Sequence, residues 1–286
     1  MSGARPCISV VVPFHNVERF LPLCIDGLRD QTLPKDKFEI VLVDNNSTDG
    51  SVAFAETCDD VTLLQQPISG SYAARNMGIR EARGEIIATL DPDCRPDPDW
   101  LEQVASAMRD PECMVVLGHQ RHASRSEALE LLELYEAEKI AYVTERGEKE
   151  LYYGYTNNMA FRRTLFDQIG LFPERVRGGD TIFVRRVVDQ FGSKVVRFNP
   201  DMKTTHLEVD TLNAYYTKRA VYGTSNERIS HVIPYRPLRN GERWDVFSKL
   251  ARKHRFPLRK KLLLLALLVP GALLYETGRR RGMFKR

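Results

Sequence analysis

The chain has 286 residues, of which 43% are hydrophobic and 28% charged, and its net charge is +4 at pH 7. This apolar content supplies a substantial core for one large α/β domain or two smaller ones, which argues against disorder. The small net charge argues against a nucleic-acid binder with a dominant basic field. Five cysteines without a CxxC pair indicate reduced thiols, and no signal peptide is visible at the start, so we expect a cytoplasmic protein.

The first part of the chain alternates strand and helix patterns. Short runs rich in β-branched and aliphatic residues predict buried strands at 8–12, 38–43 and 86–90, with Pro13 ending the first, and a further strand at 61–64. Apolar residues at helical spacing predict a helix at 18–29, and further helices follow Ser47 and Gly70. This β-α-β-α-β-α-β order is typical of a nucleotide-binding half-sheet.

Beyond residue 95 the alternation is looser. Helices are predicted at 99–109, 126–144 and 180–191, and strands at 114–117 and 195–198. No repeat or low-complexity linker interrupts the first 230 residues. We therefore predict one domain over 1–230, with a nucleotide-binding half at 1–95 and a second half at 96–230, followed by a helical tail at 231–286.

Two carboxylates follow the strand predicted at 86–90, in Asp91-Pro92-Asp93. The carboxyl ends of strands are where open α/β sheets bind ligands. Two hard oxygen donors one residue apart suit a divalent cation such as Mg²⁺ or Mn²⁺, and the alternative is an Asp-Pro turn.

Polar residues also follow the first two strands. Asp44 can accept hydrogen bonds from a base or a ribose, although it could instead only cap the next helix, which is the role we expect for Ser47. Arg75 opens a later helix, and its guanidinium suits a diphosphate, with a surface ion pair as the alternative.

Taken in order, these motifs resemble family 2 glycosyltransferases with the GT-A fold. The resemblance is close over residues 8–93 and continues less tightly to about 206. It rests on Val11-Val12-Pro13-x-x-Asn16, Val43-Asp44-Asn45-Asn46-Ser47-Thr48-Asp49, Ala74-Arg75-Asn76-x-Gly78, Gly84-Glu85 and Leu90-Asp91-x-Asp93.

The resemblance implies a Rossmann-like mixed sheet flanked by helices and a nucleotide-diphosphate sugar donor, with a preference for UDP. It places Asp44 near the base, Asp91 near the ribose or the metal, and Asp93 on the metal. The 96–230 half then becomes the acceptor half. The remaining donor-binding residues that it implies are Pro13, Asn16, Asn46, Arg75, Asn158 and Met159. His15 stands where the family usually has Tyr.

Two later residues complete the expected site. Asp180 aligns with the family's general base in inverting members, although Gly179 replaces the usual Glu, and an Asp after two glycines could simply cap the helix. His206 can complete the metal shell or touch the diphosphate, and a structural role is equally open.

The resemblance thus predicts an inverting, Mg²⁺- or Mn²⁺-dependent transferase that moves a sugar to a hydroxyl of a glycan or lipid-linked acceptor. The alternative is a non-catalytic nucleotide-sugar or glycan-binding scaffold subunit.

The tail combines an apolar stretch with basic clusters. Residues 262–275 carry no charge, and between Arg252 and Arg286 the only acid is Glu276. A spanning helix needs about 20 apolar residues, and Pro270-Gly271 would weaken a single helix, so a free-standing span is not expected. We expect residues 252–286 to contact the cytosolic face of a membrane. The alternatives are packing on the domain or a homo-oligomer contact.

Overall fold

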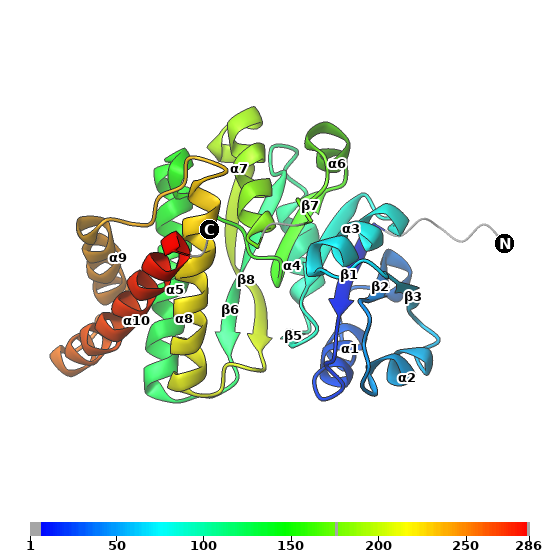
Figure 1. Ribbon diagram of the computed structural model, residues 1–286, viewed down its shortest axis with the longest axis horizontal. Coiled ribbons are helices and arrows are strands. Elements are labelled where there is room, and N and C mark those ends of the chain that lie inside the picture. The colour runs from blue at the N-terminus through cyan, green and yellow to red at the C-terminus, as the bar shows by residue number, and fades with distance from the viewer. Residues whose placement is uncertain (1–6, 175–176, 285–286) are drawn as a thin grey trace.

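One mixed sheet organises the described residues, 7–174 and 177–284, of the computed structural model (Figure 1). Its eight strands have the order β3-β2-β1-β4-β7-β6-β8-β5. The strands are β1 (Ile8–Phe14), β2 (Phe38–Asp44), β3 (Thr62–Gln65), β4 (Ile86–Leu90), β5 (Cys94–Pro96), β6 (Val115–His122), β7 (Asn158–Arg162) and β8 (Val196–His206).

Helices flank this sheet, and α5, α8, α9 and α10 gather at the end of the molecule away from β1–β3 (Figure 1). The helices are α1 (Leu21–Arg29), α2 (Ser51–Glu56), α3 (Ser71–Glu81), α4 (Trp100–Ala107), α5 (Glu127–Arg146), α6 (Thr164–Ile169), α7 (Gly179–Phe191), α8 (Leu212–Ser230), α9 (Asn240–Lys253) and α10 (Leu258–Phe284). The predicted mixed sheet with flanking helices is confirmed.

The first four predicted strands form the first half of the sheet. β1 lies between β2 and β4, and parallel pairing places Phe14 opposite Asp44, so both strands end at one edge. The strand does not stop at Pro13, as predicted, but continues through Phe14. Pairing with β4 ends at Val11, so the missing N–H of Pro13 interrupts no bond on that side.

Two strands of the second half, β6 and β8, extend beyond the apolar runs from which they were predicted. β6 continues through the polar residues 118–122, with an irregularity at Gly118/His119, and β8 runs on to His206. His206 therefore ends the strand instead of following it. Short β5 pairs antiparallel with β8 and sets Cys94 opposite His206. This pairing brings the residues after β4 next to the end of β8.

The tail forms part of the folded unit, because α10 packs along α8. A Cβ on Gly223 would lie 2.0 Å from the carbonyl oxygen of Tyr275, and one on Gly278 would lie 2.0 Å from that of Ala220. The helix runs without a break through Pro270, and the Tyr216 hydroxyl donates to the carbonyl of Leu267 at 2.9 Å one turn earlier. Packing thus outweighs the expected weakening. No helix within the described ranges is long and apolar enough to cross a membrane.

Candidate active site

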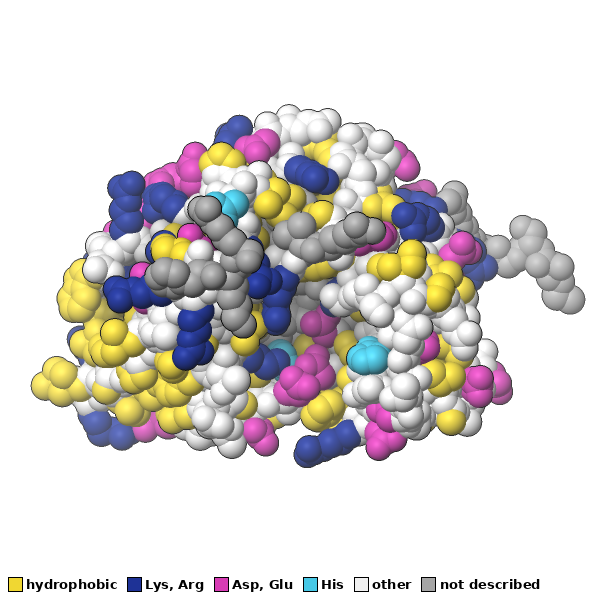
Figure 2. All heavy atoms as spheres, in the orientation of Figure 1, with side chains coloured by type: hydrophobic (Ala, Val, Ile, Leu, Met, Phe, Trp, Pro, Cys, Tyr) yellow, Lys and Arg dark blue, Asp and Glu magenta, His cyan; other side chains and the backbone are white. Residues whose placement is uncertain are grey.

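A cavity of about 880 Å³ opens between the two halves of the molecule (Figure 2). It is lined by the start of α3, the ends of β4 and β8, the start of α7 and the C-terminal helices. Four of the expected site residues line it: Arg75, Asp91, Asp180 and His206. Residues from both halves of the chain therefore meet at one chamber.

The loops after β1 and β2 are fastened to each other. The Asn16 side-chain oxygen accepts from the backbone of Thr48 at 2.7 Å, and the Asn16 backbone donates to the Ser47 hydroxyl at 3.1 Å. The expected helix cap at Ser47 is therefore wrong, since α2 begins at Ser51 after Gly50. Ser47 instead holds the two loops together.

Asp44 and Asn46 lie in the second of these loops. The Asp44 carboxylate accepts from the backbone of Ser47 at 3.0 Å through one oxygen, and the residue is 6% exposed. Asn46 is exposed, with φ of 66°, and donates to the Pro67 carbonyl. Pro13 is buried within β1. Among the described lining residues of the cavity, none of these three appears, so any contact with a base is made beside the chamber.

Asn45, for which the sequence predicted no separate role, links these loops to α3. Its amide donates to the carbonyls of Gln66 and Ile68, and its oxygen accepts from the backbone of Gly70 at 2.7 Å. Gly70 adopts φ of 137° directly before α3. Asn45 therefore fixes the point from which Arg75 projects, and its place within the Asp44 motif was the available signal.

Arg75 is buried and faces the acidic motif. It is 4% exposed, forms an ion pair with Asp91 and donates to the Ser71 carbonyl. The alternative of a surface ion pair is excluded by this burial. The Asp91 side chain remains 29% exposed, so a guanidinium and a carboxylate are presented together to the cavity.

Asp93 and His206 form the core of a candidate metal centre. Asp93 Oδ2 lies 3.5 Å from His206 Nε2, and ligand atoms of Asp93, Cys94 and His206 lie within 4.8 Å of one another. Burial, reinforced by the charge of Asp91, raises the pKa of Asp93 to about 7. Burial and the Lys218 ammonium lower the pKa of His206 to about 4, so its imidazole is neutral.

These donors fit a divalent cation. The Asp93 carboxylate, which lies beside the negative charge of Asp91, and the neutral His206 imidazole are ligands that Mn²⁺ accepts. Burial raises the pKa of the Cys94 thiol well above its usual range, so the protonated thiol is a poor ligand. Lys218 Nζ lies 2.7 Å from His206 Nε2 and 3.1 Å from Glu208. A cation on His206 therefore requires Lys218 to turn toward Glu208, which makes Asp93 the anchor of the site.

Asp180 lies in the first turn of α7 and points to the cavity. Its carboxylate accepts from the backbone of Thr181 at 2.7 Å and hydrogen bonds with the Tyr72 hydroxyl. The helix cap is Gly178, with φ of 90°, so the alternative of a capping role for Asp180 is wrong. Burial raises the pKa of this carboxyl above its usual range, which is the direction that suits a general base.

Asn158 and Met159 are wholly buried and do not line the cavity, which corrects their expected contact with a donor sugar. The Asn158 oxygen accepts from the Trp100 indole at 2.8 Å, and its amide donates to the carbonyls of His119 and Met202. The amide thus joins β7 to α4, β6 and β8. Its neighbour Asn157 lines the cavity instead.

Asn158→Ala is expected to lower the free energy of unfolding by about 2–4 kcal/mol, because three hydrogen bonds are lost and the Trp100 N–H is left buried without a partner. Urea denaturation measures this loss. Asn213→Ala, at an exposed position in α8, is the control and should change stability little. If Asn158→Ala kept the stability of the unmodified protein but lost donor binding, Asn158 would be a donor-binding residue, as first predicted.

The sheet and the placement of the site define a GT-A type of protein. A mannosyltransferase from Pyrobaculum calidifontis, solved with GDP-Man and Mn²⁺, superimposes with a TM-score of 0.64 at 22% identity, covering 98% of this chain and 81% of that one. TarS from S. aureus, solved with UDP-GlcNAc, gives 0.53 at 18% identity, covering 98% and 93%.

The sequence comparison then identifies the family. Residues 9–170 match glycosyl transferase family 2, and the chain belongs to that family. The glycosyltransferase AglE of Haloferax volcanii is 30% identical over 203 residues, which cover 66% of this chain and 64% of that protein. The chain thus spans less than two thirds of the length of this relative.

Proposed function

We propose that this protein is an inverting glycosyltransferase that moves a sugar from a nucleotide diphosphate to a hydroxyl of a glycan or lipid-linked acceptor. The observation that carries the proposal is the meeting of Asp180, Arg75 and Asp91 around one cavity, with Asp93 and His206 beside them. Family membership and the nucleotide-sugar complexes of the structural neighbours support it.

In the proposed reaction, the acceptor oxygen attacks the anomeric carbon of the donor sugar from the face opposite the leaving group. Asp180 takes the hydroxyl proton, and the bond to the nucleoside diphosphate breaks with its electron pair on the diphosphate. One displacement of this kind inverts the anomeric configuration. Arg75 faces the departing charge, and the base lies by Asp44, Asn16, Pro13 and Asn46.

Asp93 and His206 would hold a Mg²⁺ or Mn²⁺ ion. Asp91 would become a third ligand if its ion pair with Arg75 broke. Such an ion supplies Lewis-acid neutralisation of the diphosphate charge, which contributes several kcal/mol in comparable enzymes. In the structure, Asp91 forms an ion pair with Arg75, and the neutral His206 imidazole accepts a hydrogen bond from Lys218. An ion bound to Asp91 or His206 therefore replaces one of these contacts.

A panel of nucleotide sugars with and without Mn²⁺ tests this proposal through thermal stability. A bound ligand at a hundred times its Kd adds about 2.7 kcal/mol of stability, so the correct donor should raise Tm by several degrees only when Mn²⁺ is present. We expect a UDP-sugar to give the largest shift. The absence of a shift with every nucleotide sugar would overturn the proposal, and a shift without nucleotide release in a turnover assay would favour the scaffold alternative.

The exposed face of α10 supports the proposed contact with a membrane surface. Leu258, Leu262, Val269 and Leu273 are 57–70% exposed there, and basic residues stand at both ends of the helix. Two further basic residues of the tail, Lys285 and Arg286, lie outside the described residues. Each Lys or Arg near an anionic leaflet adds about 1 kcal/mol of binding.

Vesicle co-sedimentation tests this contact. Full-length protein should bind vesicles of equal amounts of phosphatidylglycerol and phosphatidylcholine at low salt, because the anionic lipid attracts basic segments. Leu262→Asp with Leu273→Asp should reduce the bound fraction several-fold. Ile68→Asp, at an exposed apolar position in the other half of the chain, is the control. Equal binding by all three proteins would exclude α10 as the contact.

A further inference from the structure

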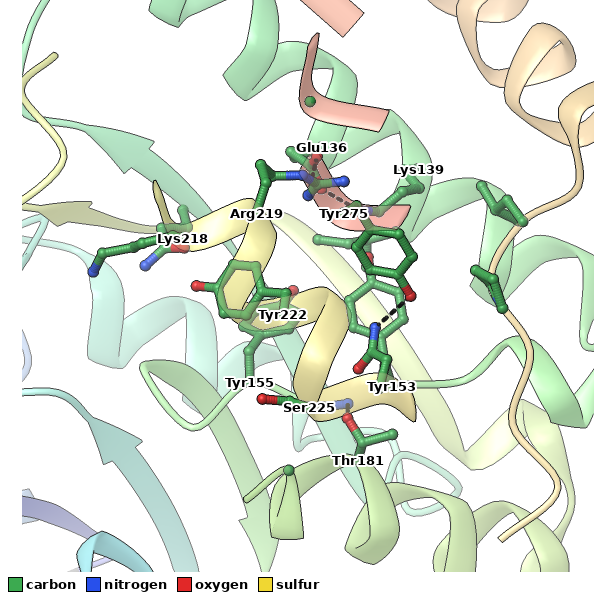
Figure 3. Close-up of a pocket in the computed structure, with 18 of the residues that line it drawn as sticks. Glu136, Lys139, Tyr153, Tyr155, Thr181, Lys218, Arg219, Tyr222, Ser225 and Tyr275 are labelled. Atoms are coloured by element: carbon green, nitrogen blue, oxygen red, sulfur yellow. Dashed lines mark hydrogen bonds and ion pairs between the residues drawn. The ribbon is translucent and has the colours of Figure 1, made fainter. Parts of the chain in front are cut away.

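The cavity extends beyond Asp180 into a distal part bounded by α5, α8, α9 and α10. We define this distal part by Glu136 and Lys139 of α5, Arg219 of α8, Arg243 of α9 and the facing side of α10. In Figure 3, Glu136, Lys139, Arg219 and Tyr275 lie together, whereas Lys218 points away from them on the other side of α8. Lys218 and Arg219, although adjacent in α8, therefore point to different ends of the cavity.

The distal part carries more positive than negative charge. Arg219 lies 2.9 Å from Glu136, and Lys139 forms an ion pair with the same carboxylate. Arg243 has no carboxylate within ion-pairing distance among residues 7–174 and 177–284, and its side chain donates only to the Leu238 carbonyl. Of the described carboxylates that line the cavity, Asp91, Glu174 and Asp180 belong to the α3 and α7 side. The distal part, as defined, thus contains one carboxylate and three cations.

These groups are close enough to influence one another. Although burial raises the pKa of Glu136, Arg219 and Lys139 outweigh it and bring the pKa to about 2. Burial lowers the pKa of Lys139, and the charges of Arg219 and Arg243 act in the same direction. A second anion beside these cations would relieve their mutual repulsion.

Two donors of the distal part have no partner. The Arg219 Nε and the Tyr153 hydroxyl are buried, and neither makes a hydrogen bond to another described residue. A buried donor without a partner costs about 1–3 kcal/mol. These two donors lie beside excess positive charge. Phosphate oxygens can accept hydrogen bonds from both donors and supply the negative charge.

Most residues of α10 that line the cavity are apolar. Leu265, Leu267, Leu268 and Ala272 of α10 line the same cavity. A ligand seated there would place an anion against α5, α8 and α9 and an apolar portion against α10. The lining of the chamber therefore suits an anion that also carries an apolar portion.

Tyr222 connects this part of the cavity to the reacting groups. Its side chain lines the same cavity as Asp180 and Arg219. Figure 3 places Tyr222 and Tyr155 between Lys218 and Tyr153. A ligand bound at Arg219 can thus extend past Tyr222 toward Asp180.

We propose that Arg219, Arg243, Lys139 and Tyr153 form an acceptor subsite for a phosphate group, separate from the diphosphate of the donor. The inference rests on the proposed function, because it assigns this phosphate to the acceptor whose hydroxyl Asp180 deprotonates. The phosphate belongs either to a lipid phosphate, with its chain along α10, or to a soluble phosphorylated sugar. It stays intact, since the transfer breaks only the bond between donor sugar and nucleotide.

Binding of simple phosphates to the full chain tests the subsite without any turnover. The probes are dodecyl phosphate, glucose 1-phosphate and the neutral amphiphile dodecyl glucoside, titrated calorimetrically with UDP and Mn²⁺ present to fill the donor end. We expect both phosphates to bind and dodecyl glucoside to bind much more weakly than dodecyl phosphate. The Arg219→Gln/Arg243→Gln double variant should lose about tenfold or more in phosphate affinity, as expected for charged hydrogen bonds.

Arg252→Gln is the matched control, since Arg252 is exposed on the same helix as Arg243 and does not line the cavity. It should bind both phosphates like the unmodified protein. Tighter binding of dodecyl phosphate than of glucose 1-phosphate assigns the subsite to a lipid phosphate, and similar binding assigns it to a soluble one.

Unchanged phosphate affinity in the double variant, with its melting temperature retained, would overturn the subsite, and so would equal binding of dodecyl phosphate and dodecyl glucoside. A less stable double variant is replaced by Arg243→Gln alone, which breaks no ion pair. Failure of the proposed function would appear differently, as an absence of nucleotide-sugar binding in the unmodified protein.

Discussion

Asp180→Asn is expected to reduce sugar transfer by about 10²–10⁴-fold, the range that a positioned general base supplies. The amide has the shape of the carboxylate, and its oxygen can still accept from the Thr181 backbone, so the start of α7 should be preserved. It cannot take a proton from the acceptor hydroxyl. Donor binding should therefore remain, and the loss should appear in kcat.

The control for this variant is Asp189→Asn, on the same helix, where the carboxylate is half exposed and pairs with Arg185. Its turnover should be near normal. The rate of the unmodified enzyme should fall as pH falls through the pKa of Asp180, because only the ionised form accepts the proton. Burial raises that pKa, so the fall should begin at a higher pH than for an ordinary Asp. Near-normal turnover by Asp180→Asn would remove Asp180 from the mechanism.

The first half of the fold follows from apolar patterns alone. β1, β2 and β4 are almost entirely buried, so a continuous hydrophobic run marks each of them. β6 and β8 could not be bounded in this way, since their last residues are polar and line the site. These polar ends pair with each other, from His119 opposite Lys203 to His122 opposite His206.

Some residues of the candidate site could likewise be predicted from the sequence, whereas others could not. Asp91 and Asp93 directly follow a strand, Arg75 lies near the start of α3, and the structure brings all three to one cavity or its edge. Lys218, Arg219 and Glu136 lie within long helices, where charged residues are ordinarily solvated. Only the packing of α5 and α8 shows that these charges face a chamber. The environment of Asn158 was equally invisible, because its partners are 39 to 58 residues away along the chain.

Asp93→Asn is expected to reduce metal-supported transfer by at least about a hundredfold, because the Lewis-acid contribution is several kcal/mol and each 1.36 kcal/mol is tenfold in rate. Asp93 is the carboxylate of the cluster that also contains His206, and an amide oxygen binds a divalent cation more weakly. Mn²⁺ titrations of donor-induced stabilisation and of activity measure the effect, with Asp201→Asn, exposed on β8, as the control.

The same experiment separates a metal role from a purely electrostatic one. EDTA should stop the unmodified enzyme, and excess Mn²⁺ or Mg²⁺ should restore it. If Asp93 only neutralises the nearby Lys218 ammonium, then Asp93→Asn should leave the Mn²⁺ dependence unchanged and shift the pKa of the adjacent His206 instead, which NMR titration would detect. Full activity in EDTA would exclude the ion altogether, and the charge of the diphosphate would then fall to Arg75 and Lys218, the cations already beside Asp91 and His206.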